Sequence, residues 1–551
     1  MARRLLMIGS LLTIVPSLKA ALVEGSTAAA ASAIQVSTTT AEHRQAPIIS
    51  RITIRGTDIF DLETNVALNK FPYRTINWLH IQTREEVIRR ELEFKVGDRL
   101  DAFLISETER NLRALSFVRA ARIARFPQPD GTVALVVHVQ DAWTTEPFLN
   151  LGGLNRIDTT TFGFQEKNVL GFGKNLEFQY ESGPGSTKRE YDYSDPRLLG
   201  SHWQFSAQSV KQTSGDDTNF TLERPFYSAD TRYSLRGYKE SANTIFPDFD
   251  NNVKVSEFEQ HKHIGDVFGG IKVGGGRDVV NHAGLGYRSE TERYARDSQS
   301  DPTRQIPADQ DLETIYTNLE TTHNHFIEAT RLEKMTRIED LNLGPSILLS
   351  PGVSPKLFTS NQTGDALTAS YDESFLFKND DLFSTHLGYS GRNEFNAPEN
   401  QKYQIQGKYY WRRMDSNVLV INTRAEWGDK LDSDNLVMLG RENGLRGFKT
   451  NNFVGNKSGL LNIEDRMFFV DDVFNLLSFG GAVFYDAGTT WSQGRPVALS
   501  QVKSDVGAGL RFGLTRSSNE LIVRLDFVYR LQREFSTDPH FVVAFGTGQA
   551  F

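Results

Sequence analysis

From Trp143 to the last residue, the sequence is a long succession of short stretches in which apolar and polar residues alternate. A period of two places one kind of side chain on each face of an extended strand. Between positions 520 and 531 the odd positions are apolar or aromatic, and the even positions are mainly charged. No later segment offers the roughly 18 consecutive apolar residues that a membrane helix needs, so a membrane crossing there would require strands.

Alternation alone would also suit a soluble β-sandwich. The N-terminus favours an exported protein, because Arg3 and Arg4 precede an apolar run that is too short to span a bilayer comfortably. Residues 18–20 and 31–33 are possible signal-peptide cleavage sites. We therefore expect a signal peptide over residues 1–33 and a flexible lead-in over 34–46. Repeated alternation behind an export signal favours a transmembrane antiparallel β-barrel over residues 143–551. At roughly 25 residues per strand and connection, that length suits about 16 strands.

The composition excludes several kinds of functional site. The chain has no cysteine, which excludes disulfides, thiolate metal ligands and cysteine nucleophiles. Its net charge of −8, without a long basic run, gives no sign of a nucleic-acid partner. His261 and His263 share one strand face, but no third ligand stands near them in the sequence. Because hydrolase motifs and catalytic carboxylate pairs are also absent from the sequence, we expect no enzyme activity, no metal and no other cofactor.

Residues 47–142 predict a small α+β domain that precedes the barrel. A half-buried strand ends at Gly56, and two amphipathic helices follow over about 83–97 and 101–117. Two strands, 118–126 and 132–141, complete the order β-α-α-β-β. Residues 61–82 predict an irregular insertion.

This region resembles a POTRA (polypeptide-transport-associated) domain. The resemblance lies in the Gly97-Asp98 turn between the helices and in the helix-to-strand passage "LRALSFVRAARI". It implies that a strand edge binds client segments, or periplasmic or lipoprotein partners, by β-augmentation.

The last twelve residues read "HFVVAFGTGQAF". Alternation places Phe541, Val543, Phe545 and Phe551 on one face, which we expect to meet lipid. Small residues, including Gly546 and Gly548, occupy the other face. A terminal aromatic on such a strand resembles the recognition signal of bacterial outer-membrane barrels. The alternative is an aromatic that ends a soluble edge strand by chance.

Together these features resemble the outer-membrane assembly and secretion superfamily, which includes BamA, TamA and the two-partner secretion transporters. Residues 162–180 resemble its second and third barrel strands, and residues 194–200 resemble the short turn that follows. The stretch "LRGF" (445–448) resembles the family motif Val-Arg-Gly-Phe/Tyr, with leucine in the first position. The resemblance implies a bacterial outer-membrane protein whose POTRA domain lies in the periplasm.

In that family the sixth extracellular loop carries this motif and folds back into the barrel. The resemblance implies that Leu445, Arg446, Gly447 and Phe448 form an inward latch. Alternation places Asp486, in "FYDAG", and Glu464, in "LLNIEDRMFF", on the lumen side as candidate partners. Arginine suits the role because its donor fork holds carboxylates in a fixed geometry. The alternative is a solvated arginine in a surface loop.

The resemblance further implies a protein insertion or translocation factor that performs no covalent chemistry. Its first strand, about 147–153, would meet its last, about 540–551, at a weak seam that opens sideways. The expected partners are the outer-membrane lipid bilayer and unfolded outer-membrane or secreted client proteins. The alternatives are a two-partner-type secretion pore for one exoprotein and a passive outer-membrane channel.

Overall fold

A computed structural model describes residues 46–551 except 63–69, 152–159, 184–185, 251–252, 297–300, 304–305, 356–362, 395–396, 433–434, 493, 495–497, 519, 534–535 and 537. The expected signal peptide and almost all of the expected lead-in lie outside these residues. None of the described helices is long and apolar enough to cross a membrane.

The N-terminal α+β region contains a three-stranded sheet in the order β1-β3-β2. Strand β1 (Ile49–Thr57) pairs in parallel with β3 (Val133–Asp141), and β2 (Val118–Pro127) pairs antiparallel with β3. Helices α3 (Glu85–Arg90) and α4 (Ala102–Ala114) pack on this sheet. The order of elements is the predicted one, with an additional helix, α2 (Tyr73–Leu79), inside the stretch expected to be irregular.

The core of this region follows the helical and strand periodicities of the sequence. Val87, Ile105 and Leu112 from the helices meet Leu135 and Val137 from the central strand, and all five side chains are buried. Helix α4 begins at Asp101, whose carboxylate accepts a hydrogen bond from the amide of Phe103 at 2.9 Å. This is the usual stabilisation of a helix N-terminus by an aspartate side chain.

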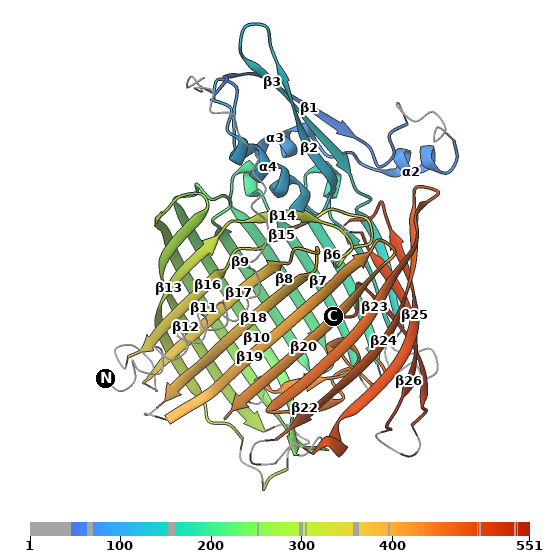
Figure 1. Cartoon of the computed structure of the whole chain (residues 1–551). Helices are drawn as coiled ribbons and strands as arrows, with labels where there is room; N and C mark the ends of the chain where they lie inside the picture. Colours follow the sequence, from blue (N-terminus) through green and yellow to red (C-terminus); the bar gives the residue numbers. More distant parts are fainter. Residues whose placement is uncertain are drawn as a thin grey trace, which may run out of the picture. The chain divides into compact units, whose positions relative to one another are not determined.

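Most of the described residues from Thr145 onward form one closed antiparallel barrel of 20 strands (Figure 1). The strands are β4 (Thr145–Leu151), β5 (Thr160–Glu166), β6 (Asn175–Gly183), β7 (Ser186–Asp195), β8 (Gln204–Gln212), β9 (Gly215–Arg224), β10 (Tyr233–Asp250), β11 (Val253–Gly275), β12 (Val279–Arg296), β13 (Gln310–His323), β16 (Ser346–Ser354), β17 (Gly364–Leu376), β18 (Leu382–Glu394), β19 (Ala397–Met414), β20 (Asn417–Asp429), β23 (Lys457–Val473), β24 (Leu477–Trp491), β25 (Lys503–Leu514), β26 (Ile522–Arg530) and β27 (Phe541–Thr547).

The predicted architecture is confirmed, but the barrel has 20 strands instead of about 16. The expected number assumed long connections, whereas several strands here are joined by very short turns. Gln212 of β8 lies opposite Gly215 of β9, and Gly183 of β6 lies opposite Ser186 of β7. The stretch 162–180 does supply the second and third barrel strands, β5 and β6.

We call the barrel end at which β3 leads into β4 the proximal rim, and the opposite end the distal rim. Two connections contain small hairpins of their own. Strands β14 (Phe326–Ala329) and β15 (Glu339–Asn342) lie in the proximal connection between β13 and β16, which we call the proximal loop (324–345). Strands β21 (Val437–Leu439) and β22 (Phe453–Gly455) lie in the distal connection between β20 and β23.

The outer face of the barrel carries many large apolar side chains that are exposed. Examples are Phe162, Phe164, Leu222, Leu235, Val267, Ile271, Leu285, Leu319, Ile347, Ile405, Trp427, Phe469, Val483, Leu510, Phe527 and Phe541. On β26 the exposed residues alternate with Arg524, Asp526 and Val528, which are buried on the inner face. Such an apolar outer surface with a polar interior is the arrangement of a barrel that stands in lipid.

Candidate functional site

The distal connection 430–456 carries the predicted latch and lies against the inner wall of the barrel. Leu445 and Phe448 are buried in an apolar cluster with Leu439 and Phe453 of the same connection and Leu460 of β23. The rings of Phe448 and Phe453 meet edge to face, with their centroids 5.2 Å apart. This connection is the eighth at the distal rim in chain order, not the sixth that the resemblance implied.

Arg446 is 2% exposed and is bound to both acidic residues that the sequence placed in the lumen. Its Nε and Nη2 donate to the two carboxylate oxygens of Asp486 at 2.7 and 2.9 Å, and its Nη1 donates to Glu464. Its guanidinium also lies 3.5 Å from the ring centroid of Phe484. A two-pronged, stacked contact of this kind requires arginine and cannot be reproduced by lysine.

The carboxylates that hold Arg446 are themselves held by the barrel wall. Glu464 accepts from Arg466 Nε at 2.8 Å and lies 3.3 Å from Arg511 Nη2. Asp486 accepts a hydrogen bond from the side-chain amide of Asn462 at 2.7 Å. Buried charges are stable when they are paired and hydrogen-bonded, so this network fixes the position of the loop tip.

Two glycines let the loop tip approach the wall. The amide of Gly447 donates to Asp505 at 3.0 Å, and its carbonyl accepts from Arg530. A Cβ on Gly447 would lie 3.0 Å from the Asp505 carboxylate. Gly444 has φ = 112°, which favours glycine, and a Cβ there would lie 2.4 Å from Leu460.

The proximal loop reaches into the lumen from the other end and meets the same network. Arg466 donates to the carbonyl of Leu332, and its Nη1 lies 3.8 Å from Glu333. Glu333 also accepts from Lys408 and from the hydroxyl of Tyr410. Burial opposes the charge of Glu333, but Arg466 and Lys408 outweigh it and hold the pKa of that carboxyl below its usual range.

Helix α4 of the N-terminal region contacts the proximal loop directly. Arg113 Nε donates to Asp340 at 2.8 Å, and Arg337 donates to the carbonyls of Arg113 and Val118 at 2.7 and 2.6 Å. A series of contacts therefore runs from Arg446 through Glu464 and Arg466 to the proximal loop, and from that loop to α4.

The last strand differs from the sequence expectation at its end. Strand β27 stops at Thr547, and its exposed and partly buried residues include Phe541, Val543 and Phe545, while Gly546 faces inward next to Arg524.

The alternation implied that Phe551 continues the lipid-facing row. The structure shows that it does not. Gly548 has φ = 73° and ends the extended geometry, so the chain turns before its last residue. The carbonyl of Phe551 accepts from Lys408 Nζ at 2.8 Å, and its ring lies within 5.7 Å of the Arg446 and Arg466 guanidinium carbons. Its side chain packs with the apolar lining of the lumen.

The barrel closes where β27 neighbours β4. Both strands have seven residues, whereas β11 has 23. The seam therefore lies between two of the shortest barrel strands, close to the predicted positions, although residues 152–153 of the expected first strand lie outside the described residues.

Sequence reasoning missed several residues of the network, although their signal was present. Asp505 and Arg511 occupy the same face of β25, separated by glycines at every second position. Asp526 and Arg530 belong to the charged face of β26 that the alternation displayed. Glu333 has no comparable signal, because its partners come from distant strands and the fold alone unites them.

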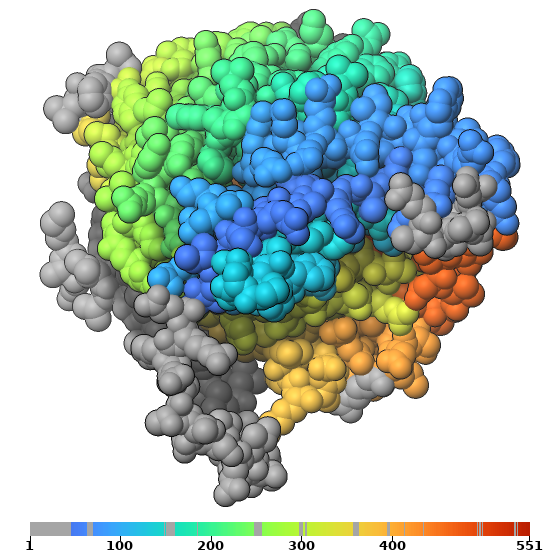
Figure 2. Space-filling view, turned by 90° about the horizontal axis from the view of Figure 1, so that it is seen from above, coloured from blue at the N-terminus to red at the C-terminus, as the bar shows by residue number. Residues whose placement is uncertain are grey.

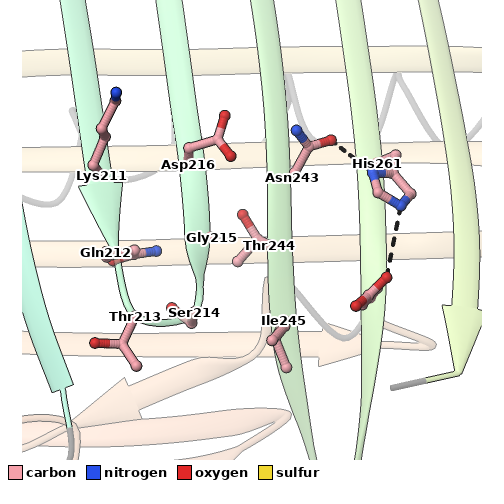
Figure 3. Close-up of a pocket in the computed structure, with 11 residues that line it drawn as sticks. Lys211, Gln212, Thr213, Ser214, Gly215, Asp216, Asn243, Thr244, Ile245 and His261 are labelled. Atoms are coloured by element: carbon pink, nitrogen blue, oxygen red, sulfur yellow. Dashed lines mark hydrogen bonds and ion pairs between the residues drawn. The ribbon is translucent and has the colours of Figure 1, made fainter. Parts of the chain in front are cut away.

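A cavity of about 570 Å³ lies away from this network, where β10 and β11 extend beyond the short β8–β9 hairpin (Figure 3). Most of the residues that line it are of polar type, and His261 Nδ1 lies 2.6 Å from Asn243 Oδ1. No group of three residues suited to hold a metal ion occurs in the part of the chain that the structure describes.

Comparisons with known proteins give weak likenesses. No protein-family model and no curated protein matches the chain. Similar solved structures include BamA from Haemophilus ducreyi lacking POTRA domains 1–3, at 13% identity and a TM-score of 0.36, covering 91% of this chain and 84% of that one. CdiB from Acinetobacter baumannii has 11% identity and a TM-score of 0.43, with coverages of 92% and 74%. CdiB from Escherichia coli has 12% identity and a TM-score of 0.45, with coverages of 91% and 76%. The barrel assignment therefore rests on the strand pairing of the chain itself.

Proposed function

We propose that this chain is a bacterial outer-membrane insertion or translocation factor of the superfamily that includes BamA, TamA and CdiB. The N-terminal region would be its POTRA domain, in the periplasm. The observation that carries the proposal is the buried latch, in which Arg446 holds a distal loop inside the lumen. A passive diffusion channel has no use for a buried ionic lock between a loop and its own wall.

The lumen contents support the same conclusion. The proximal loop contributes Leu332 and Met335 to an apolar cluster with Val420 and Phe468 of the wall. An apolar cluster across part of the lumen obstructs water and ions instead of guiding them. The proposed factor would keep this lumen closed and act at its seam.

The seam would be the place where clients engage. Strands β4 and β27 are short, so little backbone pairing has to be broken to separate them. The exposed strand edges would then pair with client strands by β-augmentation. In the N-terminal region, β1 lies at a sheet edge and offers a second surface of the same kind.

The test is a reconstituted insertion assay with the full chain in lipid vesicles. Because the chain has no native cysteine, one cysteine in β4 and one in β27 would form the only disulfide, across the seam. A control disulfide would join Asn243 and His261, which are paired across β10 and β11. We expect oxidation to stop the insertion of an unfolded outer-membrane barrel only in the seam variant, and reductant to restore it.

Equal insertion with the seam locked and open would contradict the proposal. Co-purification of one large exoprotein, with no effect on other outer-membrane proteins after depletion, would instead favour the secretion pore. A large steady conductance that is unchanged by Arg446→Ala would favour the passive channel.

A further inference from the structure

Helix α2 and its flanks expose an unusual amount of large apolar surface. Phe71 is 82% exposed and Trp78 is 81% exposed, and Leu79 and Ile81 beside them are also exposed. Isolated exposed apolar residues are common, but four within eleven positions form a patch that calls for a partner. We call this surface the α2 patch (Phe71, Trp78, Leu79 and Ile81).

The patch is displayed by a folded support. Phe60 and Tyr73 are buried beneath it, with their ring centroids 4.9 Å apart. The side-chain amide of Asn77 donates to the carbonyl of Phe60 at 2.8 Å and its oxygen accepts from the Phe60 amide at 3.1 Å. The helix therefore presents its outer residues in a fixed direction, while its inner residues attach it to the region.

The support is joined to the proximal rim at the β23–β24 turn, on the same side of the barrel as the seam. Tyr73 donates from its hydroxyl to the carbonyl of Phe474, in the β23–β24 turn, at 2.9 Å. Trp143, two residues before the start of seam strand β4, packs against the same support, and its amide donates to the carbonyl of Arg516 at 2.6 Å. Figure 1 shows α2 at the rim next to the C-terminal strands, and Figure 2 shows blue residues of the N-terminal region reaching the edge beside orange-red ones.

At this point the rim itself is apolar on the outside. Phe474 is 74% exposed at the tip of the turn, and Phe469 and Val470 are exposed near the end of β23. Through Tyr73, the buried support of the α2 patch is bonded to the turn that carries these exposed side chains. We expect apolar residues held at this rim to reach the level of the lipid head groups.

The charges around the α2 patch also favour phospholipid as its partner. Residues 70–82 contain Lys70 and Arg74, both exposed, and the sequence there has no acidic residue. Aromatic and aliphatic residues that are flanked by basic ones are typical of segments that lie in the membrane interface. The cations would meet lipid phosphates while the rings enter the boundary between head groups and acyl chains.

We infer that the α2 patch is a membrane-binding site that inserts into the proximal leaflet near the β23–β24 turn, on the seam side of the barrel. It binds phospholipid through Phe71, Trp78, Leu79 and Ile81, with Lys70 and Arg74 on the phosphates. The inference rests on the proposed function only in requiring a barrel that stands in a bilayer. Its consequence is that the N-terminal region is attached to the membrane on the side of the barrel that opens.

The experiment uses the full chain in vesicles of phosphatidylethanolamine and phosphatidylglycerol, with one nitroxide spin label per variant. Labels are placed by Trp78→Cys in the patch, Asp130→Cys in the exposed β2–β3 turn and Phe162→Cys on the outer face of β5. Collisions with oxygen report lipid, and collisions with a water-soluble nickel chelate report water. We expect the oxygen-to-nickel ratio at 78 to exceed that at 130 several-fold and to approach that at 162.

A ratio at 78 equal to that at 130, with lipid exposure intact at 162, would overturn the membrane-binding site and leave the proposed function standing. A label at 78 that is shielded from both reagents would also overturn it, because a protein or a second copy would then cover the patch. A watery signal at 162 would overturn both ideas, since the barrel would not stand in the bilayer.

Discussion

Substituting Arg446, the arginine of the latch, should lower the free energy of unfolding of the barrel. Among the described residues, Arg446 is the cation that pairs with Asp486, and both side chains are almost completely buried. Arg446→Ala leaves that carboxylate buried without its cation, which costs about 3–5 kcal/mol. Arg446→Lys keeps a charge but loses the fork, so we expect it to recover only part of the loss.

A double-mutant cycle on Arg446 and Asp486 isolates their interaction. The free energy of unfolding would be measured for the four proteins in vesicles, by urea titration followed through tryptophan emission. We expect a coupling of about 2–3 kcal/mol, because each single substitution leaves the other charged group buried without its partner. The control is the Arg293–Asp311 pair, in which one nitrogen, Nη2, donates to both carboxylate oxygens at 2.8 and 2.9 Å and the arginine side chain is 43% exposed.

The control pair should show a coupling of about 0–1 kcal/mol, and salt should weaken it. The latch pair should keep most of its coupling in high salt, because water and ions do not reach it. Equal couplings in the two cycles would refute the reasoning, since burial would then add nothing to the interaction.

Three further outcomes are expected. Gly447→Ala should destabilise the barrel by about 1–3 kcal/mol through overpacking, whereas Gly459→Ala, whose Cβ would meet nothing within 4 Å, should not, as urea titration can show. Deleting Phe551 should lower the urea midpoint of the folded barrel; a loss of membrane insertion with an unchanged midpoint would instead favour the lipid-facing orientation. Burial, together with the nearby carboxylates of Glu107 and Glu91, raises the pKa of Glu93 to about 7, so its folded form binds a proton that the unfolded form releases near its ordinary value. Stability of the N-terminal region should therefore fall from pH 5 to pH 7 and then level off; Glu93→Gln should reduce that slope without abolishing it, because burial also raises the pKa of Asp141 to about 6, and a dye on a cysteine at position 130 reports the urea midpoint.

The sequence was most informative where a single period decides the structure. Alternation alone placed Asp486 and Glu464 in the lumen, because a strand cannot change faces without a bulge. The order of elements in the N-terminal region likewise followed from helical and strand periodicities. Family resemblance pointed to Arg446, and the structure brings it to both carboxylates.

Other features depend on distances that no local pattern encodes. The strand number was underestimated because turn lengths set it, and two-residue turns leave little trace beside long polar loops. Phe551 was placed on the lipid face because alternation was extended past Gly548, where the backbone leaves the extended region. The partners of Glu333 could be found only after distant segments had been brought together, and the α2 patch only once the exposure of its residues was known.

The inward position of Phe551 has a consequence for how the protein is made and handled. The ring of Phe551 lies 5.7 Å from the guanidinium carbon of Arg446, and its main-chain oxygen accepts a hydrogen bond from Lys408. A truncated chain could pair all 20 strands and still lack this final piece. A purification tag fused to the C-terminus would have to share the lumen with the latch, so reporters belong elsewhere on this chain.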